Sequence, residues 1–174
     1  MLSAMQADVL APSIRRVSVE ASAAALALAA QAWPESERAG QLAALAEIVR
    51  SGQRDSLVLI AAHCGDRLCG ALLAQVLTGR TAVVWPPQFA ADGSPAIAAL
   101  LLDEFCRQMR TLGVCLGQAV LESTRSAGAL ALQAAGFVHA SDLSYLAAVS
   151  FGGGMAVCGW PAQSLSNAAV QGWG

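Results

Sequence analysis

The sequence predicts an α/β fold: a mixed sheet with antiparallel N-terminal strands, a central strand-helix-strand (βαβ) unit and about four helices. Apolar runs bounded by turn residues follow one another between positions 57 and 87, as in an antiparallel meander. A helical segment with apolar residues at every fourth position lies between two short apolar runs, which is the pattern of a βαβ unit. Alanine- and leucine-rich segments with clear stop signals supply the other helices.

The N-terminal part predicts one strand and two helices. RVSVE, residues 16–20, alternates apolar and polar side chains and predicts the first strand. The alanine-rich segment 21–32 predicts a helix that Pro34 ends. Ser36 is the expected N-cap of a second helix, which Gly52 closes.

The middle of the chain predicts a three-stranded meander. SLVLIAAHC and RLCGALLAQVLTG are separated by Gly65 and Asp66, a pair typical of tight hairpin turns. RTAVVWPP adds a third strand, which Pro86 and Pro87 end because proline cannot donate to a strand ladder.

The following segment predicts the βαβ unit and a last helix. Ser94 caps a long helix, Pro95 occupies its first position, and its buried stripe is Ile97, Leu101, Phe105 and Met109. VCLGQAVLE predicts a buried strand, STRSAGALALQAAGF a helix, and VHASDLSYLAAVSF one or two final strand pieces. We therefore predict an N-terminal extension at 1–14, a domain at 15–150, and a glycine-rich tail at 151–174 that is disordered or truncated.

The composition of the chain limits the classes of partner that we expect it to bind. Among 174 residues there are ten arginines, no lysine, and a formal net charge of -2, so nucleic-acid binding is not expected. No apolar run approaches the roughly 20 residues that span a bilayer, and the N-terminus lacks the pattern of a signal peptide. We expect a cytoplasmic protein without membrane contact. The 56% hydrophobic content suggests that a partner subunit, as in a homodimer, or a missing segment of chain covers some apolar surface.

Five cysteines, at positions 64, 69, 106, 115 and 158, form no CxxC pair. The odd number and wide spacing favour reduced, partly buried thiols over a zinc site or a disulfide framework. We expect no metal.

The order of elements, together with GSPAIA at 93–98 and AAGF at 134–137, resembles the GNAT superfamily of N-acyltransferases over residues 15–149. In that family the central helix begins with the pattern Gln/Arg-x-x-Gly-x-Gly/Ala, whose backbone N–H groups hold the pyrophosphate of acetyl-CoA. The resemblance implies the same role for the start of this helix. The pattern places Gly93, Ala96 and Ala98 at its three defined positions, with Ser94 and Ile97 between them. Only Ala98 satisfies it.

Two interpretations of this helix start stay open. Ala96 adds a methyl group where a ligand would approach, and Pro95 removes one N–H donor, so the segment is either an eroded phosphate cradle or a capped helix. The resemblance also implies that two strands separate near Val84 and Gln118 and bind pantetheine there through their backbones. Trp85 either walls the pantetheine groove or caps the edge of the sheet.

The family's second signature, Asn-x-x-Ala-x-x-x-Tyr-x-x-x-Gly-Phe, matches here at Gly136 and Phe137. Ser126 takes the Asn position and Leu132 takes the position of the tyrosine that protonates the leaving thiolate. Leucine cannot donate that proton. The single tyrosine of the chain, Tyr145, follows the helix and is expected to pack in a strand.

The candidate catalytic groups are Glu122 and His63. Glu122 ends a predicted strand, where ligands bind in open α/β sheets, or else interacts with the start of the next helix. His63 has a side chain suited to proton transfer near neutral pH, but it could equally be a satisfied strand histidine. Arg125 is a candidate partner for the 3′-phosphate of CoA or an ordinary solvated charge.

We therefore expect an acetyl-CoA-dependent N-acetyltransferase acting on a small-molecule or peptide amine. The alternative is a catalytically inactive GNAT-like domain that serves as a structural or protein-interaction module. A nucleotide-binding βαβ module is disfavoured, because neither GxGxxG nor GxxxxGK[ST] is present.

Overall fold

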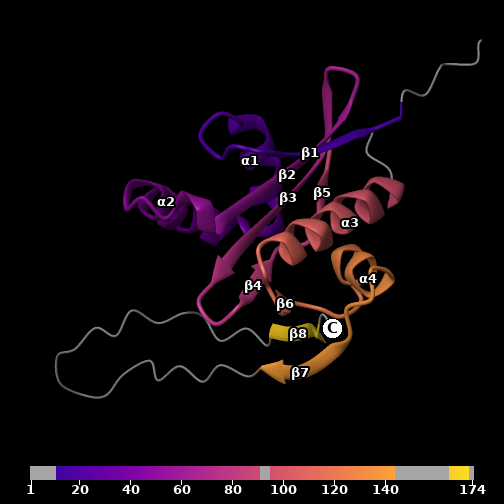
Figure 1. Ribbon diagram of the computed structural model, residues 1–174. Coiled ribbons are helices and arrows are strands. Elements are labelled where there is room, and N and C mark those ends of the chain that lie inside the picture. Colours follow the sequence, from indigo (N-terminus) through magenta and orange to yellow (C-terminus); the bar gives the residue numbers. More distant parts are fainter. Residues whose placement is uncertain (1–10, 91–94, 144–164, 173–174) are drawn as a thin grey trace, which may run out of the picture.

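A computed structural model describes residues 11–90, 95–143 and 165–172 (Figure 1). Its elements follow the predicted order, with two additional strands. The strands are β1 (Ser13–Val17), β2 (Leu57–Cys64), β3 (Arg67–Leu77), β4 (Thr81–Val84), β5 (Gln88–Phe89), β6 (Leu116–Leu121), β7 (His139–Leu143) and β8 (Leu165–Gly172). The helices are α1 (Ala23–Ala29), α2 (Glu35–Arg50), α3 (Pro95–Thr111) and α4 (Ala127–Ala134), with short 3-10 turns η1 (Ala30–Ala32) and η2 (Arg54–Ser56).

The strands form one eight-stranded sheet in the order β1-β2-β3-β4-β6-β8-β7, with β5 paired to β3 beside β4. Strands β4 and β6 are parallel, whereas the other pairs are antiparallel. The predicted fold class is therefore confirmed: antiparallel strands precede a central β4-α3-β6 unit.

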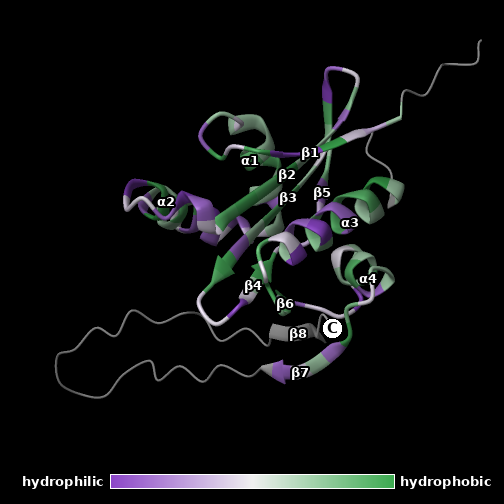
Figure 2. Cartoon of the chain, in the orientation of Figure 1, coloured by the Kyte–Doolittle hydropathy of each residue, from purple (hydrophilic) through white to green (hydrophobic). Residues whose placement is uncertain are grey.

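Each face of the sheet buries its own hydrophobic core. Helices α1 and α2 cover one face, where the core contains Leu28, Trp33, Leu45, Leu59 and Leu73. Helices α3 and α4 cover the other face (Figure 1). There the predicted stripe of α3 is confirmed, because Leu101, Phe105 and Met109 are fully buried and Ile97 is 6% exposed. Figure 2 shows β2 and β3 as hydrophobic in their central parts, as expected for strands covered on both faces.

Two ends of elements differ from the prediction. β1 begins at Ser13 rather than Arg16, so part of the predicted N-terminal extension, 1–14, belongs to the sheet. Ser36 lies inside α2 instead of capping it, because Pro34 directly precedes the first helical residue. Proline is favoured at a helix start because its fixed φ suits the position and its missing N–H has no partner there.

Two strands were not predicted. After Pro86 and Pro87 the chain returns to the sheet as β5, where Gln88 and Phe89 pair with Ala71 and Gly70 of β3. Within the tail predicted to be disordered or truncated, residues 165–172 form β8, which pairs with β6 and β7. At these eight residues the structure has a strand that the sequence pattern did not predict. Alternation is weak in LSNAAVQG, so the strand depends on its neighbours rather than on a local pattern.

Candidate functional site

The two parallel strands at the centre of the sheet separate part of the way along. β4 and β6 pair from Thr81 and Leu116 to Val83 and Gln118. Beyond that point β6 continues to Leu121 with β8 as its partner, while the chain after Val84 follows β3 through β5. Trp85 still donates its backbone N–H to Leu73 of β3 at 3.0 Å. An opening between carboxyl ends of parallel strands results, which is where α/β sheets bind ligands.

A groove lies between α3 and α4 on one face of the sheet. Its volume is about 550 Å³, and most of its lining residues are alanines. The full set of lining residues is Phe89, Ala98, Ala99, Asp103, Ala127, Leu130, Ala131, Ala134 and Ala135. Alanine leaves space between the two helices that larger side chains would fill. Of the residues in this set, only Asp103 is charged.

The front of α3 is held close to the sheet by a glycine. A Cβ atom at Gly70 of β3 would lie 2.9 Å from Cγ2 of Ile97 and 3.1 Å from Cδ1 of Leu101. Ile97 and Ala98 are buried, whereas Ala96 is exposed. The first N–H groups of a helix have no partner within the helix, so the exposed side of this first turn offers donors. Gly93 and Ser94, predicted to belong to the cradle, lie outside the described residues.

The front of α4 packs against the end of β4. Ser126 caps α4, because its hydroxyl accepts the N–H of Ala129 at 3.1 Å. Two residues further along, Gly128 lies so close to Pro86 that a Cβ atom there would be 2.5 Å from the Cβ of the proline. The proline ring therefore fixes the distance between α4 and the diverging end of β4.

Solved structures with this arrangement come from several bacteria and an archaeon. A Desulfovibrio desulfuricans protein assigned as a GNAT-family acetyltransferase is 14% identical, with a TM-score of 0.67 over 93% of this chain and 99% of that chain. A Bacillus subtilis acetyltransferase in complex with CoA is 13% identical, with a TM-score of 0.64 over 94% and 99%. PaiA N-acetyltransferase from Thermoplasma acidophilum in complex with coenzyme A is 15% identical, with a TM-score of 0.61 over 91% and 98%.

The chain has the GNAT fold. No family model matches the sequence, and no curated protein matches it either. The resemblance inferred from element order is thus confirmed as a resemblance of fold, at sequence identities where fold alone is shared.

The GNAT signature positions are divided between the groove and the core. Ala98 lines the groove. Leu132, at the position of the family's tyrosine, is fully buried in the core beneath α4. It can neither donate a proton nor contact solvent at that place. Tyr145 lies outside the described residues.

The two predicted catalytic residues are not brought together. Glu122 is exposed and directly follows β6, next to the opening. His63 is half-buried on β2, and β3 and β4 lie between its strand and β6. Among the described residues the Nδ1 atom of His63 is buried without a hydrogen-bond partner. The structure therefore favours Glu122 over His63 as the group nearest the opening.

The predicted cofactor-binding residues at the end of β4 face opposite sides. Val84 is fully buried in the core under α3 and α4, so only its backbone can contact a ligand. Trp85 is half-buried on the α1 and α2 face, where its ring meets Trp33 edge-on at a centroid distance of 5.3 Å. Trp85 therefore walls the far side of the sheet and does not line the groove.

Arg125 lies just before α4 and is exposed. Within the described part of the chain, its guanidinium forms no hydrogen bond or ion pair, which leaves it available to an anion. Sequence reasoning missed Phe89, Asp103 and the alanines of α4. The alanines could have been found, since ALALQAA places several of them on one helical face.

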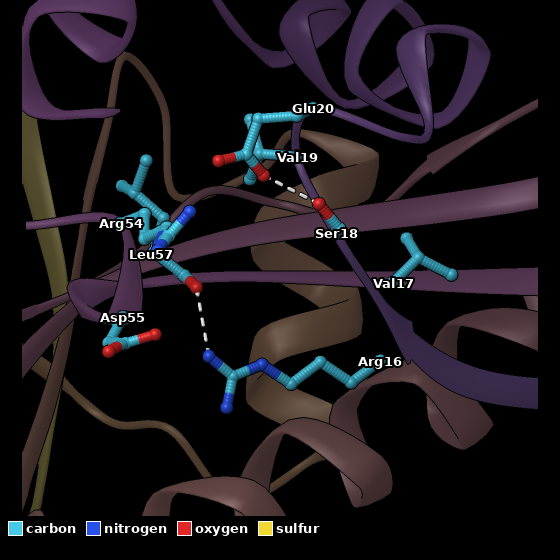
Figure 3. Close-up of a pocket in the computed structure, with 8 residues that line it drawn as sticks. All are labelled: Arg16, Val17, Ser18, Val19, Glu20, Arg54, Asp55 and Leu57. Carbon is cyan, nitrogen blue, oxygen red and sulfur yellow. Dashed lines mark hydrogen bonds between the residues drawn. The ribbon is translucent and has the colours of Figure 1, made fainter. Parts of the chain in front are cut away.

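A second hollow, of about 330 Å³, lies at the β1 edge of the sheet (Figure 3). Both signs of charge line it, and two of the charged side chains form hydrogen bonds: Arg16 donates to the carbonyl of Leu57 at 3.2 Å, and Ser18 donates to Glu20 at 2.5 Å. The hydrogen bond from Ser18 is the main reason that the pKa of Glu20 lies below its usual value. Because β2 and β3 separate this hollow from β4, it is distinct from the groove.

The described residues contain no candidate metal site and no helix that could span a membrane. No three His, Cys, Asp or Glu side chains gather there into a group that could hold a metal ion. None of the helices in residues 11–90 and 95–143 is both long and apolar enough to span a membrane.

Proposed function

We propose that this chain is an acyl-CoA-dependent N-acyltransferase that transfers an acetyl group from acetyl-CoA to a small-molecule or peptide amine. The observation that carries the proposal is the separation of β4 and β6 beside a groove between α3 and α4. Two of the structures with the same fold, from B. subtilis and T. acidophilum, are complexes with CoA. The E. coli ribosomal-protein-S18-alanine N-acetyltransferase also shares the fold, with a TM-score of 0.63 at 13% identity.

The residues present fit an extended, amide-containing ligand. Past Val83 and Gln118 the facing edges of β4 and β6 no longer pair with each other, so their backbone groups can bond the amides of a pantetheine chain. The groove volume lies within the usual range for small-molecule sites. Its alanine lining suits an apolar chain.

Nearby charges favour phosphate binding at one end of the groove and oppose it at the other. The first turn of α3 carries the positive end of the helix dipole, and Arg125 stands at the front of α4. Asp103 lies two turns further into α3 and repels an anion. We therefore place the phosphates of CoA at the front of α3, away from Asp103.

Glu122 is the group that we assign to accept a proton from the amine. It is exposed at the end of β6, and the transfer needs a base within hydrogen-bond reach of the amine or of a bridging water. Bound acetyl-CoA supplies an activated thioester. Because Leu132 replaces the tyrosine of the family and is buried, the proton for the leaving thiolate comes from solvent rather than from that position.

A titration tests the binding step. Acetyl-CoA and CoA are titrated calorimetrically into wild type, into Ala127→Trp and into Ala44→Trp. Ala127 lines the groove at the first position of α4, whereas Ala44 is an exposed alanine on α2 at the other face. Tryptophan at 127 should weaken binding by at least about tenfold, which is 1.4 kcal/mol, and tryptophan at 44 should have no effect. Equal affinities in both variants would place the ligand elsewhere.

Turnover tests the base. With an amine panel, Glu122→Gln should lower kcat about 10²-fold or more, while the affinity for acetyl-CoA remains unchanged. His63→Gln serves as the matched control, since the geometry separates His63 from the opening. A larger loss at His63 than at Glu122 would reverse the assignment.

The buried Leu132 favours one second candidate, a GNAT-like module that has lost turnover and acts through protein contacts or as a homodimer. The apolar side chain of Leu130 on the groove, 57% exposed, is consistent with such a contact. A dimeric molar mass in solution, together with CoA binding but no acetylation of any amine in the panel, would support the module.

A further inference from the structure

Two thiols on the β2-β3 hairpin lie next to each other. The Sγ atoms of Cys64 and Cys69 are 2.8 Å apart, and Cys69 also contacts the carbonyl of Ala62 at 3.3 Å. Cys64, the last residue of β2, is half-buried, whereas Cys69 is 3% exposed. Both pack into the core beneath α3.

A β-bulge brings the two sulfurs to the same face. The register of the hairpin shifts between Ala62, which pairs with Gly70, and His63, which pairs with Leu68. Cys69 is the extra residue on β3 and has no partner in this ladder. One additional residue reverses the alternation of side chains, so Cys69 faces the core on the side of Ala62 and Cys64.

We propose that Cys64 and Cys69 are a thiol-disulfide exchange site that reacts reversibly with small-molecule disulfides to form an intramolecular disulfide. A disulfide bond is about 2.05 Å long, so the sulfur atoms approach by only about 0.8 Å. The two side chains already meet across the hairpin, on either side of the turn at Gly65 and Asp66.

The exchange begins at the accessible sulfur. The Cys64 thiolate attacks one sulfur of glutathione disulfide, forms a mixed disulfide and releases one glutathione thiolate. Cys69 then loses its proton to solvent and attacks the Cys64 sulfur, which releases the second glutathione. In total one disulfide is reduced to two thiols and the protein pair is oxidised to one disulfide. Burial, together with the neighbouring Cys64, raises the pKa of Cys69 to about 11, so Cys69 is the resolving and not the attacking thiol.

The site lies under the front of α3. The backbone N–H of Ala90, just before residues 91–94, donates to the carbonyl of Cys69 at 3.3 Å. Gly70, the next residue of β3, is the glycine on which Ile97 rests. Closure of the disulfide therefore acts on the strand that supports the proposed phosphate end of the groove. This consequence, unlike the exchange site itself, rests on the proposed function.

Peptide mapping of the native, full-length protein tests the exchange. After treatment with excess glutathione disulfide and alkylation of the remaining thiols, trypsin cleaves at Arg54, Arg67 and Arg80, so the proposed disulfide joins peptides 55–67 and 68–80. We expect this linked pair to predominate in wild type and in Cys115→Ser, a control at a half-buried cysteine just before β6. Cys69→Ser should instead retain glutathione on Cys64, and Cys64→Ser should leave Cys69 unmodified. Wild type that carries only glutathione adducts, or that links the peptides only in denaturant, would overturn the proposal.

Binding measurements then separate the two proposals. The affinity for CoA is compared between the oxidised protein, the same protein after reduction, and oxidant-treated Cys64→Ser. We expect a change of at least about threefold in wild type that reduction reverses and that the variant lacks. An unchanged affinity would overturn the link to α3. Linked peptides without CoA binding in either state would count against the proposed function and leave the exchange site in place.

Discussion

The two faces of the sheet are closed in different ways. On the α1 and α2 face large side chains meet over the strands: Trp33 packs edge-on against Trp85, and Arg38 donates to the carbonyls of Ala30 and Trp33 at 3.1 and 3.3 Å. On the α3 and α4 face the core is equally buried near the strands, but alanines leave a groove between the helices. One sheet thus supports a sealed face and an open face, and side-chain size at the helix surface makes the difference.

The first prediction from this comparison is that the buried core beneath the groove contributes much more to the free energy of unfolding than the groove surface does. Phe105→Ala should lower the free energy of unfolding by about 3–5 kcal/mol, because the buried ring lies 6.4 Å from that of Phe137 and borders Gly117. Leu130→Ala, on the groove, should change it by less than about 0.5 kcal/mol. Urea denaturation measures both. A large effect at Leu130 would mean that the groove is closed in solution.

A pair of glycine variants sharpens the comparison further. Gly128→Ala should destabilise the protein by about 1–3 kcal/mol, because the new methyl group meets Pro86 at 2.5 Å. Gly40→Ala on α2, where a Cβ atom meets nothing within 4 Å, should stabilise it by about 0.5–1 kcal/mol. The same denaturation experiment checks both signs. Stabilisation by both variants would show that α4 does not pack tightly on β4.

The smallest expected effect concerns a surface ion pair of α3. Glu104 accepts from Arg107 at 2.7 Å and from Gln108 at 2.8 Å, and the hydrogen bond from Arg107 is the main reason that its pKa lies below 4.5, although partial burial opposes it. A lowered carboxyl pKa stabilises the fold above the unfolded-state value, and this contribution is lost as pH falls through the folded-state value.

Glu104→Gln should therefore cost roughly 0.5 kcal/mol at neutral pH, and the difference from wild type should disappear in acid below the pKa of Glu104. Glu47→Gln is the matched control, since Glu47 and its partner Arg50 are both largely exposed. Denaturation at several pH values makes the comparison. A cost at Glu104 that persists in acid would assign it to packing and not to charge.

Local patterns were sufficient to predict most of the fold. The four-residue stripe of α3, the turn at Gly65 and Asp66, and the stop at Gly136 each depend on neighbouring residues only, and Gly136 indeed has a positive φ of 92°. β5 and β8 were missed because both are short or weakly alternating strands whose existence depends on a partner elsewhere in the chain.

The candidate site was predicted less completely, for a related reason. Ala98 was identified through a signature, and the separation of β4 and β6 near Val84 and Gln118 was expected from the resemblance. Spacing alone gave no indication that His63 lies on a strand remote from β6, because strand order is a property of the whole sheet. The bulge at Cys69 was equally invisible, since the sequence of the hairpin is compatible with a regular ladder.

The position of β8 has a consequence for biosynthesis. β8 follows β7 along the chain and yet lies between β7 and β6. During translation β6 and β7 emerge first, so among the described strands β7 has no partner until β8 has left the ribosome. The pairings of β8 with β6 and β7 can therefore form only after β8 has been synthesised, whereas β1, β2 and β3 pair in chain order and can do so while the polypeptide is still growing.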